Sequence, residues 1–384
     1  MIRILIHIIV CSCLLQSAHT EASSLAVQHQ ITSKITDKVQ KYWLHLPQDY
    51  KENNPFGYPV MYLYDGNYLL NHTAAMTEFL NGSMPNLIIV GIESQNRNKD
   101  LTPDFPDKTN MPLTTKNPFF NYIEKELIPH INSTYNTADY RIVAGHSLGG
   151  LAVLHNLINQ PSLFNAHFAF SPAVHWQGAA ILDGLDKSLT TIEQTNFLYI
   201  GREALDKNKI FAFTMKHHNS LDKLEKTLEK HAPKNLDWHM QSFANEDHFT
   251  VAVVAQHYAF RTLYPEWFLR PEKVEEDVNS FDQFYQNLSA QYGYSIAPTE
   301  YELYALSDYL TMKQQPNKAV YISKRRLEFY PASHTAHRSL ANAYYANKNP
   351  ADALKHIKQA ILIATEEEHD NLTSYKNLQQ KFLD

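Results

Sequence analysis

The stretch Gly145-His146-Ser147-Leu148-Gly149-Gly150 holds three of the chain's 11 glycines and decides the fold prediction. It follows a short apolar run, Arg141 to Ala144, and precedes apolar residues at helical spacing from Leu151 to Ile158. Glycines at 145 and 149 allow a tight turn, because a Cβ there would collide with the neighbouring strand and helix. The stretch therefore predicts a strand, a tight turn and a helix, with Ser147 exposed at the turn.

This context is the one that a nucleophile elbow requires, although G-x-S-x-G alone would be a weak signal. A serine hydroxyl is a poor nucleophile at neutral pH and needs a base. His248 is the candidate, because it lies between a predicted outer strand and the apolar helix Thr250 to Leu263, where catalytic groups gather in open α/β sheets. His146, at the variable position of the elbow, is expected to pack or to orient other groups. His217, His218 and His231 fall in a polar helical stretch and are expected to be solvated.

The acid that orients such a histidine is expected between Ser147 and His248, at the end of a strand. Glu203 lies two residues beyond Gly201, where the apolar run from Phe197 ends, and Asp206 is the alternative acid. A surface carboxylate paired with a neighbouring arginine would look the same in sequence.

Two backbone N–H groups are candidates for an oxyanion hole. One belongs to Leu148, the residue after the nucleophile, at the start of its helix. The other belongs to Asn67, in Asp65-Gly66-Asn67 after the strand-like run Pro59 to Tyr64. By composition alone, the same tripeptide would also suit a simple turn.

The chain from about Val27 to Arg270 alternates short apolar runs with helical patterns, which is typical of a parallel α/β sheet. The expected strands are Tyr58 to Tyr64, Leu87 to Ile92, Arg141 to Ala144, Ala166 to Phe170, Phe197 to Ile200 and an outer strand from Leu236 to Ser242. Helical spacing predicts a helix over Asn117 to Ile131. We therefore expect the α/β class, with a mostly parallel sheet flanked by helices.

The pattern after Pro271 is helical throughout. A helix from Phe281 to Tyr292 is followed by a 34-residue periodicity that pairs Leu306 with Leu340, Pro316 with Pro350 and Ala319 with Ala353. A helix-turn-helix period of this length resembles the tetratricopeptide repeat. Two repeats are fewer than independent stability usually requires, so we expect them to pack on the preceding domain or on another subunit.

The first 22 residues are predicted to be a signal peptide. Arg3 precedes the apolar stretch Ile4 to Leu15, and small residues follow at Ala18 and Ala22. An apolar stretch of ~12 residues suits a signal peptide and is too short to span a bilayer. A periplasmic or secreted protein with no membrane span is therefore expected.

The composition excludes several classes of protein. Hydrophobic residues make up 44% and charged residues 19%, which is typical of a globular protein. The net charge of −6 argues against a nucleic-acid partner. Both cysteines, Cys11 and Cys13, precede the folded part, and no metal-binding, Walker or dinucleotide motif is found, so we expect no metal and no organic cofactor.

Taken in order, these motifs resemble a family of α/β-hydrolases that includes enterobactin-type siderophore esterases, S-formylglutathione hydrolase and the mycolyltransferases. The matching segments are Tyr62-Leu63-Tyr64-Asp65-Gly66-Asn67, Arg97 with Asp100-Leu101-Thr102-Pro103, Glu124 to Pro129, Gly145 to Gly150, Ser171-Pro172 and Asp247-His248-Phe249. The resemblance is nearest to the periplasmic siderophore-esterase branch, whose members cut trilactone siderophores. It implies an α/β-hydrolase fold. It also implies that the acid is the most variable member of the triad, since some enzymes of this branch work with serine and histidine alone.

The sequence thus predicts a signal peptide at 1–22, an esterase domain at 23–270, a connecting helix at 271–294 and repeats at 295–384. The predicted activity is ester hydrolysis by Ser147, His248 and Glu203 through an acyl-enzyme, on a small-molecule ester. The alternatives are an acyltransferase or peptidase with the same triad, or a scaffold with a vestigial hydrolase domain. A second subunit or a protein partner could bind through the C-terminal helices.

Overall fold

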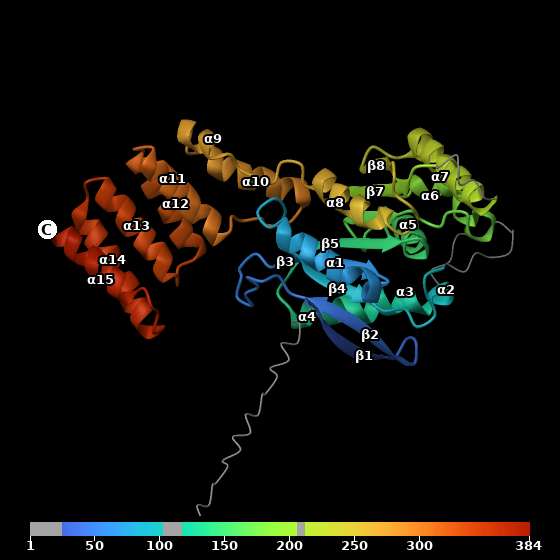
Figure 1. Cartoon of the computed structure of the whole chain (residues 1–384), viewed down its shortest axis with the longest axis horizontal. Helices are drawn as coiled ribbons and strands as arrows, with labels where there is room; N and C mark the ends of the chain where they lie inside the picture. Colours follow the sequence, from blue (N-terminus) through green and yellow to red (C-terminus); the bar gives the residue numbers. More distant parts are fainter. Residues whose placement is uncertain (1–24, 103–116, 206–211) are drawn as a thin grey trace, which may run out of the picture.

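The computed structural model of the protein describes residues 25–102, 117–205 and 212–384 (Figure 1). The predicted signal peptide and the alternative acid Asp206 lie outside these residues, as does Pro103 of the segment that begins at Asp100.

Eight strands form one sheet in the order β1-β2-β4-β3-β5-β6-β7-β8. They are β1 (Val27–Ser33), β2 (Lys38–His45), β3 (Tyr58–Tyr64), β4 (Ile88–Ile92), β5 (Thr137–His146), β6 (Ala166–Phe170), β7 (Asn196–Glu203) and β8 (Leu236–Phe243). Strands β1, β2 and β4 pair antiparallel, and all the other pairs are parallel. The expected mostly parallel sheet is confirmed.

Three strands or groups of strands differ from the sequence prediction. The antiparallel pair β1 and β2 was not expected as strands, because its residues are mostly polar and alternate with few apolar ones. Strand β5 begins four residues earlier than Arg141, and β7 extends through Glu203. Glu203 is therefore the last residue of its strand and not part of the following loop.

Helices cover both faces of the sheet, and the central strands show why. In β3, the side chains of Val60, Tyr62 and Tyr64 enter one hydrophobic core, while Met61 and Leu63 enter the other. A strand that is buried on both faces reads as a continuous apolar run, as this one does. Helices α1 (Gly66–Phe79) and α8 (Val251–Leu263) pack in the second core.

The first core lies under the helices of the other face. These are α3 (Pro118–Tyr122), the π-helical segment η1 (Ile123–Leu127), α4 (Ile128–Thr134), α5 (Leu148–Asn159), α6 (Leu185–Leu189) and α7 (Ala212–His231). Helix α3, η1 and α4 are consecutive and cover the helix predicted at 117–131. The short helices α2 (Arg97–Asp100), η2 (Trp176–Gly178) and η3 (Ala180–Leu182) lie in the connections.

The chain beyond residue 270 consists of helices. They are α9 (Pro271–Glu276), α10 (Ser280–Tyr292), α11 (Glu300–Met312), α12 (Pro316–Phe329), α13 (His334–Ala346), α14 (Pro350–Glu366) and α15 (Leu372–Leu383). Pro316 and Pro350 each occupy the start of a helix, where the missing N–H costs no intrahelical bond. The other two pairs at 34-residue spacing are buried.

Helix α10 joins the helical region to the sheet domain. Its Phe281 packs with α11 and α12, whereas Leu288 and Tyr292 pack in the core beneath α8. Direct contacts add to this link: the rings of Phe56 and Phe329 lie 5.6 Å apart, and Lys51 pairs with Glu300 at 3.8 Å. Because residues 51–56 precede β3, the helical region meets the sheet domain at the edge where the parallel strands begin. In Figure 1 the arrowhead of β5 points away from the helical region.

None of the helices that the structure describes is long and apolar enough to cross a membrane.

Candidate active site

Five parallel strands end at one edge of the sheet, and a polar residue follows or ends each of them. Asp65 follows β3, Ser147 follows β5 and Ser171 follows β6. Glu203 ends β7, and the loop after β8 carries His248. Ligand and catalytic groups gather at this edge in open α/β sheets. The topology alone thus brings together residues that are as many as 183 positions apart in the sequence, Asp65 and His248.

The turn between β5 and α5 holds Ser147 in a strained conformation, with φ 58° and ψ −113°. A Cβ on Gly145 would lie 2.4 Å from the carbonyl carbon of Gly149, so the two glycines permit the close approach. The Ser147 N–H donates to the carbonyl of Phe170 in the next strand at 2.9 Å. Non-glycine residues in such conformations persist where the surrounding structure fixes them, typically at functional sites.

His248 faces this serine. Its Nε2 lies 3.1 Å from the Ser147 hydroxyl, within hydrogen-bond distance, and its side chain is 29% exposed. His146 Nε2–H donates to the backbone carbonyl of His248 at 2.5 Å, which ties the histidine loop to the elbow. Burial, and next the charge of His248, lower the pKa of His146 to about 4, so His146 is neutral at neutral pH. It orients the loop, as its position suggested.

The other side of the His248 ring faces Glu203 and Ser171. The His248 Nδ1 lies 3.5 Å from Glu203 Oε1 and 2.9 Å from Ser171 Oγ. The Ser171 hydroxyl in turn donates to Glu203 Oε2 at 2.6 Å. Among the described residues, Glu203 is therefore the carboxylate beside His248, and the structure brings Ser147, His248 and Glu203 together.

The surroundings of Glu203 favour its ionised form. Burial raises the pKa of this carboxyl, but the interactions with His217, His248 and Ser171 outweigh that effect and hold the pKa well below its usual range. A fixed negative charge beside an imidazole selects the tautomer with a proton on the nearer nitrogen. Nδ1 of His248 then carries the proton, and Nε2 is free to accept one from Ser147.

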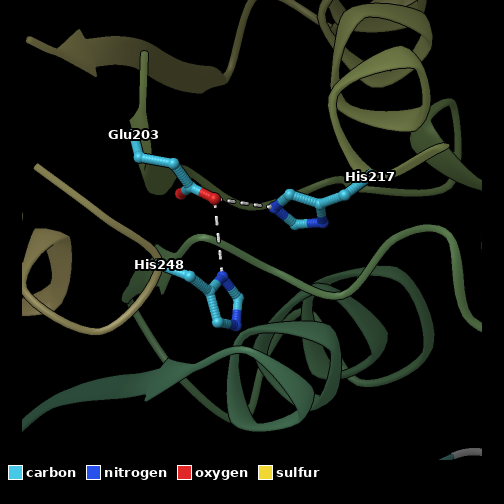
Figure 2. A group of neighbouring side chains, drawn as sticks. All are labelled: Glu203, His217 and His248. Carbon is cyan, nitrogen blue, oxygen red and sulfur yellow. Dashed lines mark ion pairs between the residues drawn. The ribbon is translucent and has the colours of Figure 1, made fainter. Parts of the chain in front are cut away.

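His217 was expected to be solvated, and that prediction is wrong. Its side chain is buried on α7, and its Nε2 lies 3.5 Å from Glu203 Oε1 (Figure 2). The same Nε2 lies 3.0 Å from Ser171 Oγ. His175 Nδ1 lies 3.1 Å from His217 Nδ1 on its far side. His218 is buried as well. The stretch around His217 is polar and was therefore expected to be solvated. In the structure this part of α7 lies against the polar edge of the sheet, where His217 finds its partners.

The two oxyanion candidates lie at helix starts on the same edge. Leu148 is the first residue of α5, and Asn67 is the second residue of α1. The first N–H groups of a helix have no intrahelical acceptor, and they lie at the positive end of the helix dipole. The parallel register, with Leu63 opposite Ala144, sets the two helix starts side by side. Asn67 lies in the first turn of α1, and its role as a donor remains a proposal.

An ion pair ties that loop to the elbow. The Arg97 guanidinium binds both oxygens of Asp65 at 3.0 Å and donates to the carbonyl of His146 at 3.1 Å. Asp65 has a left-handed backbone, with φ 55°, immediately before the first residue of α1. Arg97, which sequence reasoning singled out only through the family resemblance, thus holds the α1 loop against β5.

One group of three side chains among the described residues could hold a metal ion, namely Glu203, His217 and His248. Their nearest ligand atoms lie within 4.8 Å of one another. Each of these residues also reaches the Ser171 hydroxyl, and His248 in addition faces Ser147. The donors and acceptors are therefore matched by hydrogen bonds, and the chemistry this arrangement supports is nucleophilic attack by an activated serine.

Comparison with known proteins relates the chain to esterases. Residues 33–238 match the family model described as "Putative esterase". The ferri-bacillibactin esterase BesA of Bacillus subtilis (strain 168) is 33% identical over 167 residues, which cover 37% of this chain and 57% of that protein. The match thus spans little more than half of that curated relative.

Two solved structures resemble the whole arrangement. An IroE-like serine hydrolase from Shewanella oneidensis superposes with a TM-score of 0.67 at 25% identity, over 79% of this chain and 99% of that chain. An uncharacterised protein from Capnocytophaga ochracea superposes with a TM-score of 0.60 at 15% identity, over 92% and 99%. The first likeness confirms the expected α/β-hydrolase fold. Both matches cover more residues than the sheet domain holds, so the likeness in fold reaches into the C-terminal helices.

Proposed function

The chain belongs to the Putative esterase family, and from this premise we propose that it is a serine esterase that hydrolyses carboxylic esters through an acyl-enzyme. The observation that carries the proposal is the 3.1 Å contact between Ser147 Oγ and His248 Nε2 at the strained turn, with an ionised carboxylate behind the ring. An intact arrangement of this kind argues against a vestigial domain, which would have no need to keep it.

The proposed reaction has two halves. Ser147 Oγ attacks the ester carbonyl while His248 Nε2 takes its proton, and the same proton then passes to the departing alcohol. The negative charge on the carbonyl oxygen is held by the N–H groups of Leu148 and Asn67. Water, deprotonated by His248, then attacks the acyl-enzyme, and Ser147 leaves with the proton restored. Glu203 stays ionised throughout and stabilises the imidazolium.

We further propose that the substrate is a siderophore ester. The name of BesA states that it is an esterase of ferri-bacillibactin, and the sequence motifs resemble those of siderophore esterases. The segment at 1–22 supports export to the periplasm or beyond, where a siderophore would be met. Neither metal nor organic cofactor enters the proposed reaction.

A hydrolysis screen tests this function. Purified protein is incubated with short p-nitrophenyl esters, with ferric and iron-free trilactone siderophores, and with peptides, each with and without EDTA. We expect turnover of p-nitrophenyl esters and of the siderophores, no peptide cleavage, and equal rates on p-nitrophenyl esters in EDTA. Failure to hydrolyse any ester would overturn the proposal, and loss of p-nitrophenyl ester turnover in EDTA would favour a metal at Glu203, His217 and His248 instead.

The C-terminal helices are proposed to have no part in bond cleavage. They contact the sheet domain where the strands begin, while Ser147 lies where they end. Removing them would expose Val274 and Phe281, which pack against α11 and α12. A role in tetratricopeptide-like recruitment of a partner or a second subunit fits this separation.

Deleting residues 299–384 is therefore expected to lower solubility or change the number of subunits, while kcat per folded molecule stays within about twofold of the full chain on small and bulky esters alike. The deletion keeps Ile296, which belongs to the core of the sheet domain. Light scattering and kinetics with active sites counted by a fluorophosphonate probe measure both effects. A folded truncation that no longer reacts with the probe would contradict the separation.

A further inference from the structure

We infer that Ser171 is a positioning residue that links Glu203 to His248, so that the proposed triad operates as a relay of four side chains. This inference rests on the proposed function. Sequence reasoning noted Ser171 only as part of a family-like segment and assigned it no role.

The distances show why a direct pairing of acid and histidine is insufficient. Nδ1 of His248 lies 3.5 Å from Glu203 Oε1, beyond the 2.7–3.2 Å typical of an N–H···O hydrogen bond. The path through Ser171 Oγ has steps of 2.9 Å and 2.6 Å, both of ordinary hydrogen-bond length. The hydroxyl therefore provides the closer connection between the ring and the carboxylate.

The donors and acceptors around Ser171 allow one consistent arrangement. A hydroxyl donates one hydrogen bond and accepts two. The carboxylate of Glu203 can only accept, so the Ser171 hydroxyl donates to it and accepts from His248 Nδ1–H at 2.9 Å and from His217 Nε2–H at 3.0 Å. His217 Nδ1 then accepts a hydrogen bond from His175 Nδ1–H, so the hydrogen-bond network is complete with these side chains alone. Every proton in this arrangement has an acceptor.

The backbone holds Ser171 in this place. The residue is fully buried and has φ 40°, which is unfavourable for a residue with a Cβ. Its N–H donates to the carbonyl of Gly201 at 2.6 Å, next to the end of β7 that carries Glu203. The N–H of Ala173 donates to the carbonyl of Ser147 at 2.9 Å, so the same turn supports the nucleophile. A strained backbone conformation of this kind persists where the surrounding structure holds the residue in place, and it is typical of functional sites.

In the reaction, no proton needs to travel along this chain. When His248 takes the proton of Ser147, its Nδ1–H bond to Ser171 becomes charge-assisted, and Ser171 passes the stabilisation to the ionised Glu203. The proton stays on the imidazole until it passes to the alcohol. Ser171 orients the ring and couples it to the carboxylate, while His217 holds the hydroxyl and the carboxylate from the other side.

A double-mutant cycle of Ser171→Ala and Glu203→Gln tests the relay, with kcat and KM on a p-nitrophenyl ester as the readout. We expect Ser171→Ala to lower kcat about 10²-fold at unchanged KM, as the loss of a hydrogen bond to a charged group implies. Because both residues act on His248 through one path, the double variant should lose no more than the worse single variant. Ser171→Gly removes the same hydroxyl and relieves the positive φ, so it tests the relay with little cost in stability.

Ser323→Ala is the matched control. Ser323 is also fully buried, and its hydroxyl lies 2.6 Å from that of Ser307, in the C-terminal helices and far from the site. The kcat of this variant should equal that of the wild type. A Ser171→Gly protein with wild-type kcat, or losses that multiply in the double variant, would overturn the relay. If the wild type itself shows no hydrolysis that depends on Ser147, the proposed function fails and not the relay alone.

Discussion

Replacing Ser147 with alanine is expected to lower kcat for ester hydrolysis by on the order of 10³-fold or more. The variant lacks the atom that attacks the carbonyl, and any residual rate would come from binding and the oxyanion hole alone. The fold should be retained, because alanine keeps the Cβ in the same strained turn and the hydroxyl faces His248 rather than the core. Steady-state kinetics with circular dichroism measure both.

Ser133→Ala is the control for this variant, since it makes the same chemical change on α4, away from the site, where the hydroxyl bonds the carbonyl of His130. Wild-type activity in Ser147→Ala would mean that another group attacks the ester. Equal losses in Ser133→Ala would mean that the assay reports stability and not chemistry.

Replacing His248 with asparagine is expected to lower kcat by a similar factor, on the order of 10³. Without the imidazole, the Ser147 hydroxyl loses the one side-chain partner that it has among the described residues. His146 cannot replace it, because its Nε2 donates to the backbone of residue 248 and its pKa of about 4 makes it a weak base. The deficit should shrink as the pH is raised and hydroxide begins to act as the base.

The control is His239→Asn on the exposed face of β8, where the ring pairs with Asp237. That change should leave kcat unaltered. A His248→Asn enzyme with wild-type kcat at neutral pH would show that a different residue acts as the base.

The elbow and the central strands could be predicted from sequence because their causes are local. The tight turn at Ser147 leaves no room for a Cβ at Gly145, and the glycines that it requires all lie within six residues of sequence. Strand β3 is apolar throughout because both of its faces are buried. Strands β1 and β2 offered no such signal, since they form the polar edge of the sheet and few of their side chains enter a core.

The network behind His248 could not be predicted, because it is assembled from distant segments. Ser171, Glu203, His217 and His248 come from four elements, and only the sheet order brings them together. The polar composition at the start of α7 predicted a solvated helix. In the structure this part of α7 packs against the polar residues at the ends of the parallel strands. The one sequence signal for Glu203 was its place at the end of a strand, and the structure extends the strand to include it.

The most direct test of a serine nucleophile activated by His248 is to map a fluorophosphonate adduct by peptide mass spectrometry in the wild type, Ser147→Ala and His248→Asn proteins. The account predicts one adduct per chain on Ser147 in the wild type, none in Ser147→Ala, and an adduct that forms at least about 10²-fold more slowly in His248→Asn. An adduct on another residue, or equal labelling of the wild type and Ser147→Ala, would contradict it.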